Sequence, residues 1–434
     1  MNLVAKTYWA GTPFNMRRLP DNHAVESLLL RAPDGREHRG LLWTSRKNPK
    51  PKTAAVVMHP RADFQHHYVI PRLVEAGIAV LAATTRNPNN DTTTLHEEIV
   101  LDVASCVSHL KNARGVSNVV LIGNSGGGAL NGFYQSQAVA GKGARIATTP
   151  GGRPTRLNQV EMIPADAMIY IAAHKGEGMI MNEIIDPSVV DETNPHLTDA
   201  SLDMYDEANG FRTPAELDGS DAVWSEFDSA FVGRFRAAQR ARVSRLDAIA
   251  RALIAENERA EQLHADPDFQ KLPLDRQRDV LRREAFEPVM TIYRTMANLH
   301  YVDRHLDPSP RDYGSIFSPR PDLMNWKFMG FGRYATPHAW LSTWSGLSSH
   351  ANQMIDLPKI TAPTLFINAG KDQEIFPQTD ARPMFAAVAA TDKTYVEFPD
   401  AQHYFNPPFG QRDAPDVEKV MDVVVPWLLE RLGA

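Results

Sequence analysis

Three side chains have the types, the chain order and the local surroundings needed for nucleophilic catalysis, and the first of them is a serine. Ser125 is the centre of Gly123-Asn124-Ser125-Gly126-Gly127, which fits G-x-S-x-G directly after the apolar strand predicted over 118–122. In this pattern a strand turns sharply into a helix, and small neighbours let the turn lift the hydroxyl clear of the sheet. The pentapeptide alone is common, so its place between a strand and a helix makes Ser125 a candidate nucleophile.

The second and third side chains are an aspartate and a histidine further along the chain. A serine hydroxyl is a poor nucleophile at neutral pH, so it needs a base that is itself oriented by a carboxylate. Asp372 follows a predicted buried strand that ends at Gly370, and His403 follows the next predicted strand, 394–398. Each residue therefore comes just past the carboxyl end of a strand, where open α/β sheets bind their ligands.

Other residues compete for the roles of acid and base. Glu374 and Asp400 are alternative carboxylates, and Asp372 also fits as the cap of the following helix. Asp372 is favoured because it follows the glycine that ends the strand. His403 is favoured because it alone follows the final strand. The competing histidines are His59, His66, His67, His174, His338 and His350.

The cluster of His59, His66 and His67 suggests a metal site at first sight. Its members lack the i, i+4 helical spacing with a carboxylate that is typical of such sites. A serine, histidine and aspartate need no metal for their chemistry. We therefore predict neither a metal nor another cofactor.

In these features the sequence resembles the α/β-hydrolase superfamily, over roughly residues 24–174 and 355–434. The resemblance rests on the elbow at Ser125, on Gly370-Lys371-Asp372 and on His403, in that order along the chain. It implies an α/β-hydrolase fold, a mostly parallel, doubly wound sheet with an inserted helical cap. It also implies that Ser125 is the nucleophile, His403 the general base and then acid, and Asp372 the carboxylate that holds the imidazole tautomer.

The resemblance further implies an oxyanion hole made of backbone N–H groups. The segment Val56-Val57-Met58-His59-Pro60-Arg61 is a strand that ends where the family usually carries His-Gly-x. Pro60 has no N–H, but the donor expected from the family is the residue that follows it. The implied donors are the N–H of Gly126 and that of Arg61 or its neighbour Ala62, and the choice between these two stays open.

Length and composition are those of a soluble globular protein. The chain has 434 residues, 43% of them apolar and 23% charged, with a formal net charge of −6, so we expect two folding units and no nucleic-acid partner. No segment approaches the ~20 apolar residues of a membrane span, and the N-terminus lacks an apolar run of signal-peptide length. We expect a cytoplasmic protein without a membrane partner. Cys106, the single cysteine, is expected on a helix facing the core.

The order of predicted elements divides the chain into an arm (1–22), a core (23–174 and 355–434) and a cap (175–354). Two strands joined by Pro33-Asp34-Gly35 form an antiparallel edge. Strands then alternate with helices, which favours a parallel sheet. The predicted strands are 24–31, 38–44, 54–58, 78–82, 118–122 and 167–173, and the predicted helices between them are 68–76 and 93–111.

The cap is predicted to be helical. Residues 176–222 read as an acidic loop, whereas 223–264 and 276–300 have apolar residues at helical spacing and predict an αα-hairpin. Aromatic residues of 323–354 are expected partly in the core and partly along the active-site crevice, which favours a bulky apolar or aromatic substrate. The basic residues Arg61, Lys175 and Arg333 favour an acidic group instead, and the sequence leaves both open.

These observations predict a serine hydrolase that forms an acyl-enzyme with a carboxylic ester, its partner being a small-molecule substrate. Because fold and triad do not fix the bond that is cleaved, an amide or thioester hydrolase remains an alternative. The elbow also resembles that of the C–C bond hydrolases of meta-cleavage products. A non-catalytic binding protein of the same fold is the alternative from another class, and a homodimer through the arm or the cap is compatible with the sequence.

Overall fold

One mixed sheet organises the protein. The computed structural model describes residues 15–213, 223–328, 330–407 and 413–434, so the predicted arm lies mostly outside the described residues. The sheet has eight strands in the order β1-β2-β4-β3-β5-β6-β9-β10, in which the pairs β1–β2 and β2–β4 are antiparallel and all other neighbouring pairs are parallel. The strands are β1 (His23–Arg31), β2 (Glu37–Ser45), β3 (Thr53–Val57), β4 (Ala79–Ala83), β5 (Asn118–Asn124), β6 (Ala167–Ile171), β9 (Thr364–Ala369) and β10 (Lys393–Phe398).

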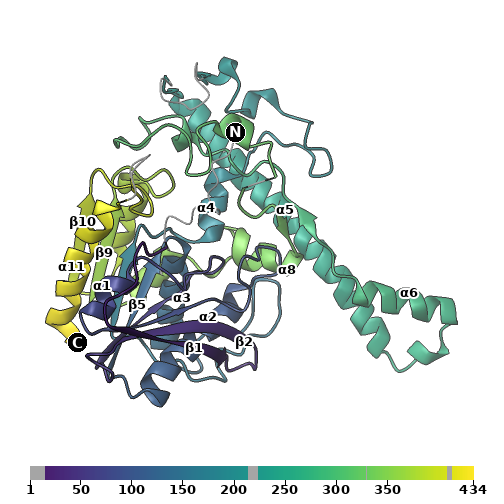
Figure 1. The fold of residues 1–434 in the computed structure, drawn as a ribbon. Coiled ribbons are helices and arrows are strands. Elements are labelled where there is room, and N and C mark those ends of the chain that lie inside the picture. Colours follow the sequence, from purple (N-terminus) through teal and green to yellow (C-terminus); the bar gives the residue numbers. More distant parts are fainter. Residues whose placement is uncertain (1–14, 214–222, 329, 408–412) are drawn as a thin grey trace.

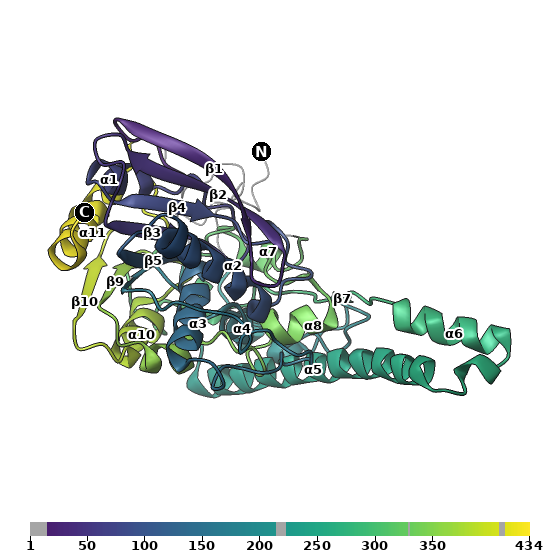
Figure 2. The ribbon, with the colours of Figure 1, turned by 90° about the horizontal axis from the view of Figure 1, so that it is seen from below.

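Helices cover both faces of the sheet (Figures 1 and 2). On one face, α2 (His96–Ser108), α3 (Gly126–Ala140) and α10 (Arg382–Ala387) enclose one apolar cluster. On the other face, α1 (Ile70–Glu75) and α11 (Pro415–Leu432) enclose a second. Successive side chains of a strand point to opposite faces, so a strand covered on both sides is apolar throughout. The predicted fold, a mostly parallel doubly wound α/β sheet with a helical insertion, is confirmed.

The register of the parallel strands brings their carboxyl ends to one edge of the sheet. Asn124, the last residue of β5, is paired with Ile171 of β6, and Ala369 of β9 is paired with Phe398 of β10. Ser125, Asp372 and His403 follow these strands and therefore leave the sheet on the same side. Cys106 is buried in α2, as predicted.

The insertion between β6 and β9 has its own apolar cluster. Its longest element is α5 (Ser229–Ala265), which begins where the Asp228 side chain accepts the N–H of Phe231 and ends before Pro267. The helix α6 (Leu274–Ala285) packs back on the far end of α5, and this αα-hairpin projects beyond the body of the protein (Figures 1 and 2). The other elements are α4 (Glu177–Ile184), β7 (Met290–Thr291), α7 (Pro321–Met324), β8 (Tyr334–Ala335), α8 (Pro337–Ala339) and α9 (Gln353–Asp356).

Two predictions for the insertion are wrong. The second helix ends at Ala285 and does not continue to residue 300, because Pro288 lacks an N–H and disfavours helical backbone just before it. Phe286 and Val289 are exposed, and Met290 pairs with Ala335 in the short β7–β8 sheet. Residues 177–184, predicted as loop, form α4, which begins after Gly176 in a conformation that favours glycine (φ +135°).

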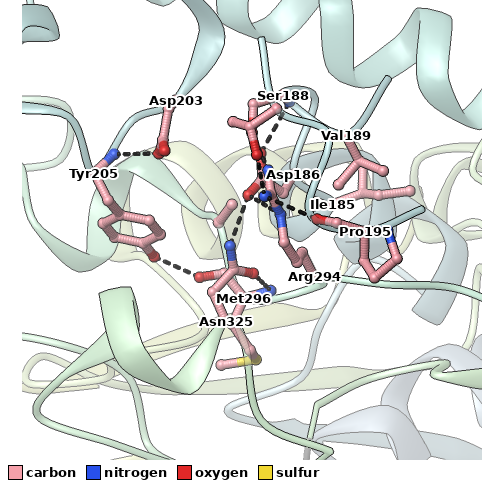
Figure 3. Close-up of polar contacts among 12 residues, drawn as sticks. Ile185, Asp186, Ser188, Val189, Pro195, Asp203, Tyr205, Arg294, Met296 and Asn325 are labelled. Atoms are coloured by element: carbon pink, nitrogen blue, oxygen red, sulfur yellow. Dashed lines mark hydrogen bonds and ion pairs between the residues drawn. The ribbon is translucent and has the colours of Figure 1, made fainter. Parts of the chain in front are cut away.

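A buried polar cluster holds the loops of the insertion together (Figure 3). The carboxylate of Asp186 accepts the N–H and hydroxyl of Ser188 and the amide of Asn325, and it lies 3.0 Å from Nε of Arg294. Nearby, the hydroxyl of Tyr205 donates to the carbonyl of Met296 (2.5 Å). These bonds pair buried polar groups that would otherwise destabilise a loop-rich domain.

None of the helices in the described part of the chain is both long enough and apolar enough to cross a membrane.

Candidate active site

Ser125 occupies a strained turn between β5 and α3. Its backbone has φ 54° and ψ −127°, a conformation that few residues other than glycine adopt. The turn is tight enough that a Cβ atom on Gly123 would come within 2.6 to 2.7 Å of the backbone of Gly127 and Gly128. The sequence G-x-S-x-G thus folds here as predicted, and Ser125 as a whole residue is 8% exposed.

The three predicted catalytic side chains lie within hydrogen-bond distance of one another. Nε2 of His403 is 3.0 Å from Oγ of Ser125, and Nδ1 of His403 is 2.7 Å from Oδ2 of Asp372. Because a carboxylate only accepts, Nδ1 of His403 is the donor, which leaves Nε2 free to accept the serine proton. Asp372 is fully buried and its Oδ1 accepts the N–H groups of Glu374 (2.8 Å) and Ile375 (3.0 Å).

The alternative acids are engaged elsewhere. Glu374 accepts the hydroxyl of Tyr301 at 3.1 Å, and burial together with the neighbouring Asp372 raises its pKa well above the usual range. Asp400 is exposed and pairs with Lys371 at 3.2 Å. The residue that orients His403 is therefore Asp372.

Two of the competing histidines also contact residues other than the serine. Nε2 of His67 lies 3.0 Å from Oδ1 of Asn124, and Nδ1 of His350 lies 2.8 Å from Oε1 of Glu97. His59 and His174 are different, because both lie beside Gly126, the residue that follows the serine.

The backbone N–H groups expected in an oxyanion hole are only partly available. The N–H of Gly126, at the start of α3, donates to no residue that the structure describes. The N–H groups of Arg61 and Ala62 instead donate to Nδ1 of His59, at 3.1 and 2.9 Å. The N–H of Arg61 therefore already has an acceptor in the side chain two residues before it, and its role as an oxyanion donor stays a prediction.

A polar cluster fills the space where residue 126 would carry a side chain. A Cβ atom on Gly126 would lie 2.9 Å from Nε2 of His59, 2.9 Å from Nε2 of His174 and 2.7 Å from Oε1 of Glu177. Glu177 in turn lies 3.1 Å from Nε2 of His96. Neither Glu177 nor His96 was singled out in the sequence. Glu177 lies in α4, a helix that was not predicted, and His96 lies in a predicted helix without a motif. His174 was a candidate only as a competing base.

The protonation of this cluster follows from burial and neighbouring charge. Burial lowers the pKa of His174 to about 4, although Glu177 opposes the shift. Burial and the nearby Arg61 guanidinium hold the pKa of His59 well below its usual value. Burial also opposes charge on Glu177 and His96, but their mutual attraction lowers the pKa of Glu177 and raises that of His96. Attraction therefore favours the charged forms of Glu177 and His96, whereas burial favours the neutral forms of His59 and His174.

The basic side chains proposed to bind an acidic group mostly have carboxylate partners. Arg61 makes two hydrogen bonds to Asp91, at 3.1 and 3.2 Å, and lies over the rings of Phe331 and Trp344. Lys175 pairs with two carboxylates, those of Glu183 and Asp380, both at 2.6 Å. Arg333 donates to the carbonyl of Asn325, and burial lowers its pKa to about 10. The aromatic residues Trp340 and Trp344 are buried.

The strand order, the elbow after β5, and the acid and histidine after β9 and β10 together define the α/β-hydrolase fold. No protein-family model matches the sequence, and no curated protein matches it.

Several solved structures are similar in fold. An esterase from Exiguobacterium antarcticum is 14% identical, with 92% of this chain and 98% of that chain covered and a TM-score of 0.39. Est1E from Butyrivibrio proteoclasticus, solved with ferulic acid, is 10% identical (94% and 100% covered, TM-score 0.46). DcsB, solved with a substrate analogue, is 11% identical (95% and 100% covered, TM-score 0.48). The assignment of the fold rests on the strand order of this chain and not on these likenesses.

Proposed function

We propose that the chain is a serine hydrolase that cleaves a carboxylic ester through an acyl-enzyme. The observation that carries the proposal is the continuous hydrogen-bonded series from Ser125 through His403 to Asp372, with heavy-atom distances of 3.0 and 2.7 Å. These distances lie in the range required for proton transfer to a general base. The buried carboxylate holds the imidazole in the tautomer that accepts the serine proton.

In the proposed reaction, Oγ of Ser125 attacks the ester carbonyl carbon while Nε2 of His403 takes its proton. Asp372 stabilises the imidazolium that forms, and the N–H of Gly126 donates to the oxyanion. The tetrahedral intermediate collapses, His403 gives its proton to the leaving alkoxide, and the acyl group stays on Ser125. Water, deprotonated by His403, then attacks the acyl-enzyme; the bond to Oγ of Ser125 breaks, His403 returns the proton to Oγ, and the acid is released.

The proposed substrate carries a bulky apolar or aromatic group. The half-buried ring of Phe331 lies 5.1 Å from the Arg61 guanidinium, close to the loop that follows β3, whereas the ring of Trp344, at 5.2 Å, is buried. Because Asp91 already neutralises Arg61, an apolar contact is favoured over recognition of an acidic group at this place. Packing against aromatic rings supplies most of the binding energy of such ligands.

A fluorophosphonate probe, followed by a panel of p-nitrophenyl esters, tests the proposal. The wild-type protein is expected to take up the probe on Ser125 and to hydrolyse at least one aryl or long-chain ester. Ser125→Ala is expected to do neither while it melts at the same temperature. Intact-protein mass measured during turnover is expected to show the acyl group on the wild type. Probe labelling that persists in Ser125→Ala, or no labelling of the wild type, contradicts the proposal.

A further inference from the structure

His59 holds the loop after β3 through one of its ring nitrogens. Nδ1 accepts the N–H of Arg61 (3.1 Å) and the N–H of Ala62 (2.9 Å). A ring nitrogen that accepts N–H groups carries no proton, so the proton of a neutral His59 ring is on Nε2. The loop thus fixes the tautomer of His59 and makes its far side a hydrogen-bond donor.

The Nε2–H of His59 lies against the start of α3. It is 2.9 Å from the place of a Cβ atom on Gly126, the residue that follows the serine. Among the described residues, the hydrogen bonds of the His59 ring are those at Nδ1, and Nε2 makes none. His174 differs, because its Nε2 lies 3.7 Å from the Glu177 carboxylate, whereas His59 has no such carboxylate contact among the described residues. His59 is 3% exposed, so its donor group faces the protein interior and not bulk solvent.

The ring stays neutral under ordinary conditions. Burial and the positive charge of Arg61 hold the pKa of His59 well below its usual value. A neutral imidazole that donates from Nε2 polarises a carbonyl oxygen without giving up its proton, as a weak acid with a high pKa does.

We propose that the Nε2–H of His59 is the second donor of the oxyanion hole, beside the N–H of Gly126, in place of the backbone N–H that Arg61 would have supplied. This assignment rests on the proposed function. The step forms and breaks no bond at His59, because its proton remains on Nε2 while the charge develops on the carbonyl oxygen. Loss of one oxyanion donor lowers kcat by about 10²–10³-fold in serine hydrolases.

Two substitutions separate this role from simple support of the loop. In His59→Asn, the side-chain oxygen takes the position of Nδ1 and accepts the N–H groups of Arg61 and Ala62, but no donor reaches the Nε2 position. In His59→Gln, the amide nitrogen reaches the Nε2 position, but the acceptor for the loop is lost. If His59 only supports the loop, His59→Asn retains activity and His59→Gln loses it. If His59 is an oxyanion donor, His59→Gln is the more active of the two variants.

The experiment measures kcat, KM and the melting temperature of both variants with the ester that the wild type cleaves best. We expect His59→Asn to fold, to keep KM within a few-fold of wild type and to lose about 10²–10³-fold in kcat. We expect His59→Gln to keep more of kcat than His59→Asn. His38→Asn is the matched control, because His38 is equally buried but contacts Thr84 and Ser105 instead; its kcat is expected to equal that of wild type.

A second readout is the inhibition constant of a trifluoromethyl ketone. Attack of Ser125 on its carbonyl carbon forms a tetrahedral adduct whose oxygen is an oxyanion. It is expected to rise in His59→Asn by the same factor as the loss in kcat/KM, as a transition-state interaction requires. The assignment is overturned if His59→Asn has the kcat of the wild type, or if His59→Gln has a lower kcat than His59→Asn. Either result leaves the proposed function standing. A wild-type protein with neither turnover nor fluorophosphonate labelling overturns both.

Discussion

The carboxylate of Glu177 lies 3.1 Å from Nε2 of His96, and both side chains are almost entirely buried. Each is the first residue of its helix, α4 and α2, so the pair joins the inserted domain to the core. A buried charge persists only when it is paired, and removing one member leaves the other in a poorly solvating environment. The position of α4 over the elbow therefore depends on Glu177 and His96 both being charged.

Glu177→Gln is expected to lower the pKa of His96. In the wild type the pKa of His96 is above 6.5, because the attraction of Glu177 outweighs burial. Without the carboxylate, burial is the largest remaining influence, and it disfavours the charged ring. The ring C–H signals of His96, assigned with the help of His96→Gln, give the pKa by NMR titration. An unchanged pKa of His96 in Glu177→Gln would show that Glu177 is not what raises it.

The same substitution is expected to change how stability depends on pH. A raised pKa in the folded state contributes stability that is present below the unfolded value of about 6.5 and is lost as pH rises through the folded pKa. In Glu177→Gln the sign reverses, because the folded protein then resists protonation. The difference in melting temperature between wild type and variant should therefore grow as pH falls from about 8 to about 6. A constant difference over this range contradicts the prediction.

Asp372→Asn is expected to lower kcat by about 10⁴-fold while the fold is retained. The amide oxygen still accepts the N–H groups of Glu374 and Ile375, but it no longer holds His403 in the tautomer that accepts from Ser125. Asp400→Asn is the matched control, because this exposed neighbour is 80% accessible and pairs only with Lys371 among the contacts described. Its kcat should equal that of wild type. A comparable loss in both variants would point to a nonspecific effect of charge.

The core was predictable because its signals are local. The strands of the sheet centre are apolar on both faces, so runs such as 118–122 and 167–171 mark them directly. The elbow also has a local signature, because a side chain at Gly123 or Gly126 would clash with neighbouring atoms and only glycine fits there. The positions of Asp372 and His403 after two strands then followed from the parallel sheet, whose carboxyl ends share one edge.

The surroundings of the serine were not predictable, because they depend on contacts between distant segments. His96 and Glu177 come into contact only when α4 packs on the core. The sequence around each of them has no pattern that predicts a buried charge. The His59 ring was visible in the sequence, but its orientation toward the Arg61 and Ala62 N–H groups is a property of the folded loop. The helix predicted over 276–300 failed because apolar spacing continues past Pro288, where the backbone cannot stay helical.

Gly126→Ala is expected to lower kcat by about 10²-fold, because a methyl group must displace the polar cluster that touches this position. The added carbon would lie 2.7 Å from Glu177 and 2.9 Å from His59 and His174. Gly233→Ala, near the start of α5, is the control for the same change: outside the backbone of its own helix, no atom lies within 4 Å of the added methyl group. It is expected to leave kcat unchanged and to stabilise the protein by about 0.5–1 kcal/mol. Equal kcat values for the two variants would contradict the steric argument.

Asp186→Asn is expected to destabilise the inserted domain by about 3–5 kcal/mol, because it leaves the buried guanidinium of Arg294 without its carboxylate. The two groups are 3.0 Å apart and each side chain is 2% exposed (Figure 3). Asp279→Asn removes an equally short contact, 3.1 Å to Arg283, at side chains that are 43% and 56% exposed. Water screens that pair, so the expected cost is at most about 1 kcal/mol. Urea unfolding followed by tryptophan fluorescence compares the variants, and equal midpoints would mean that the Asp186 pair contributes no more than a surface contact.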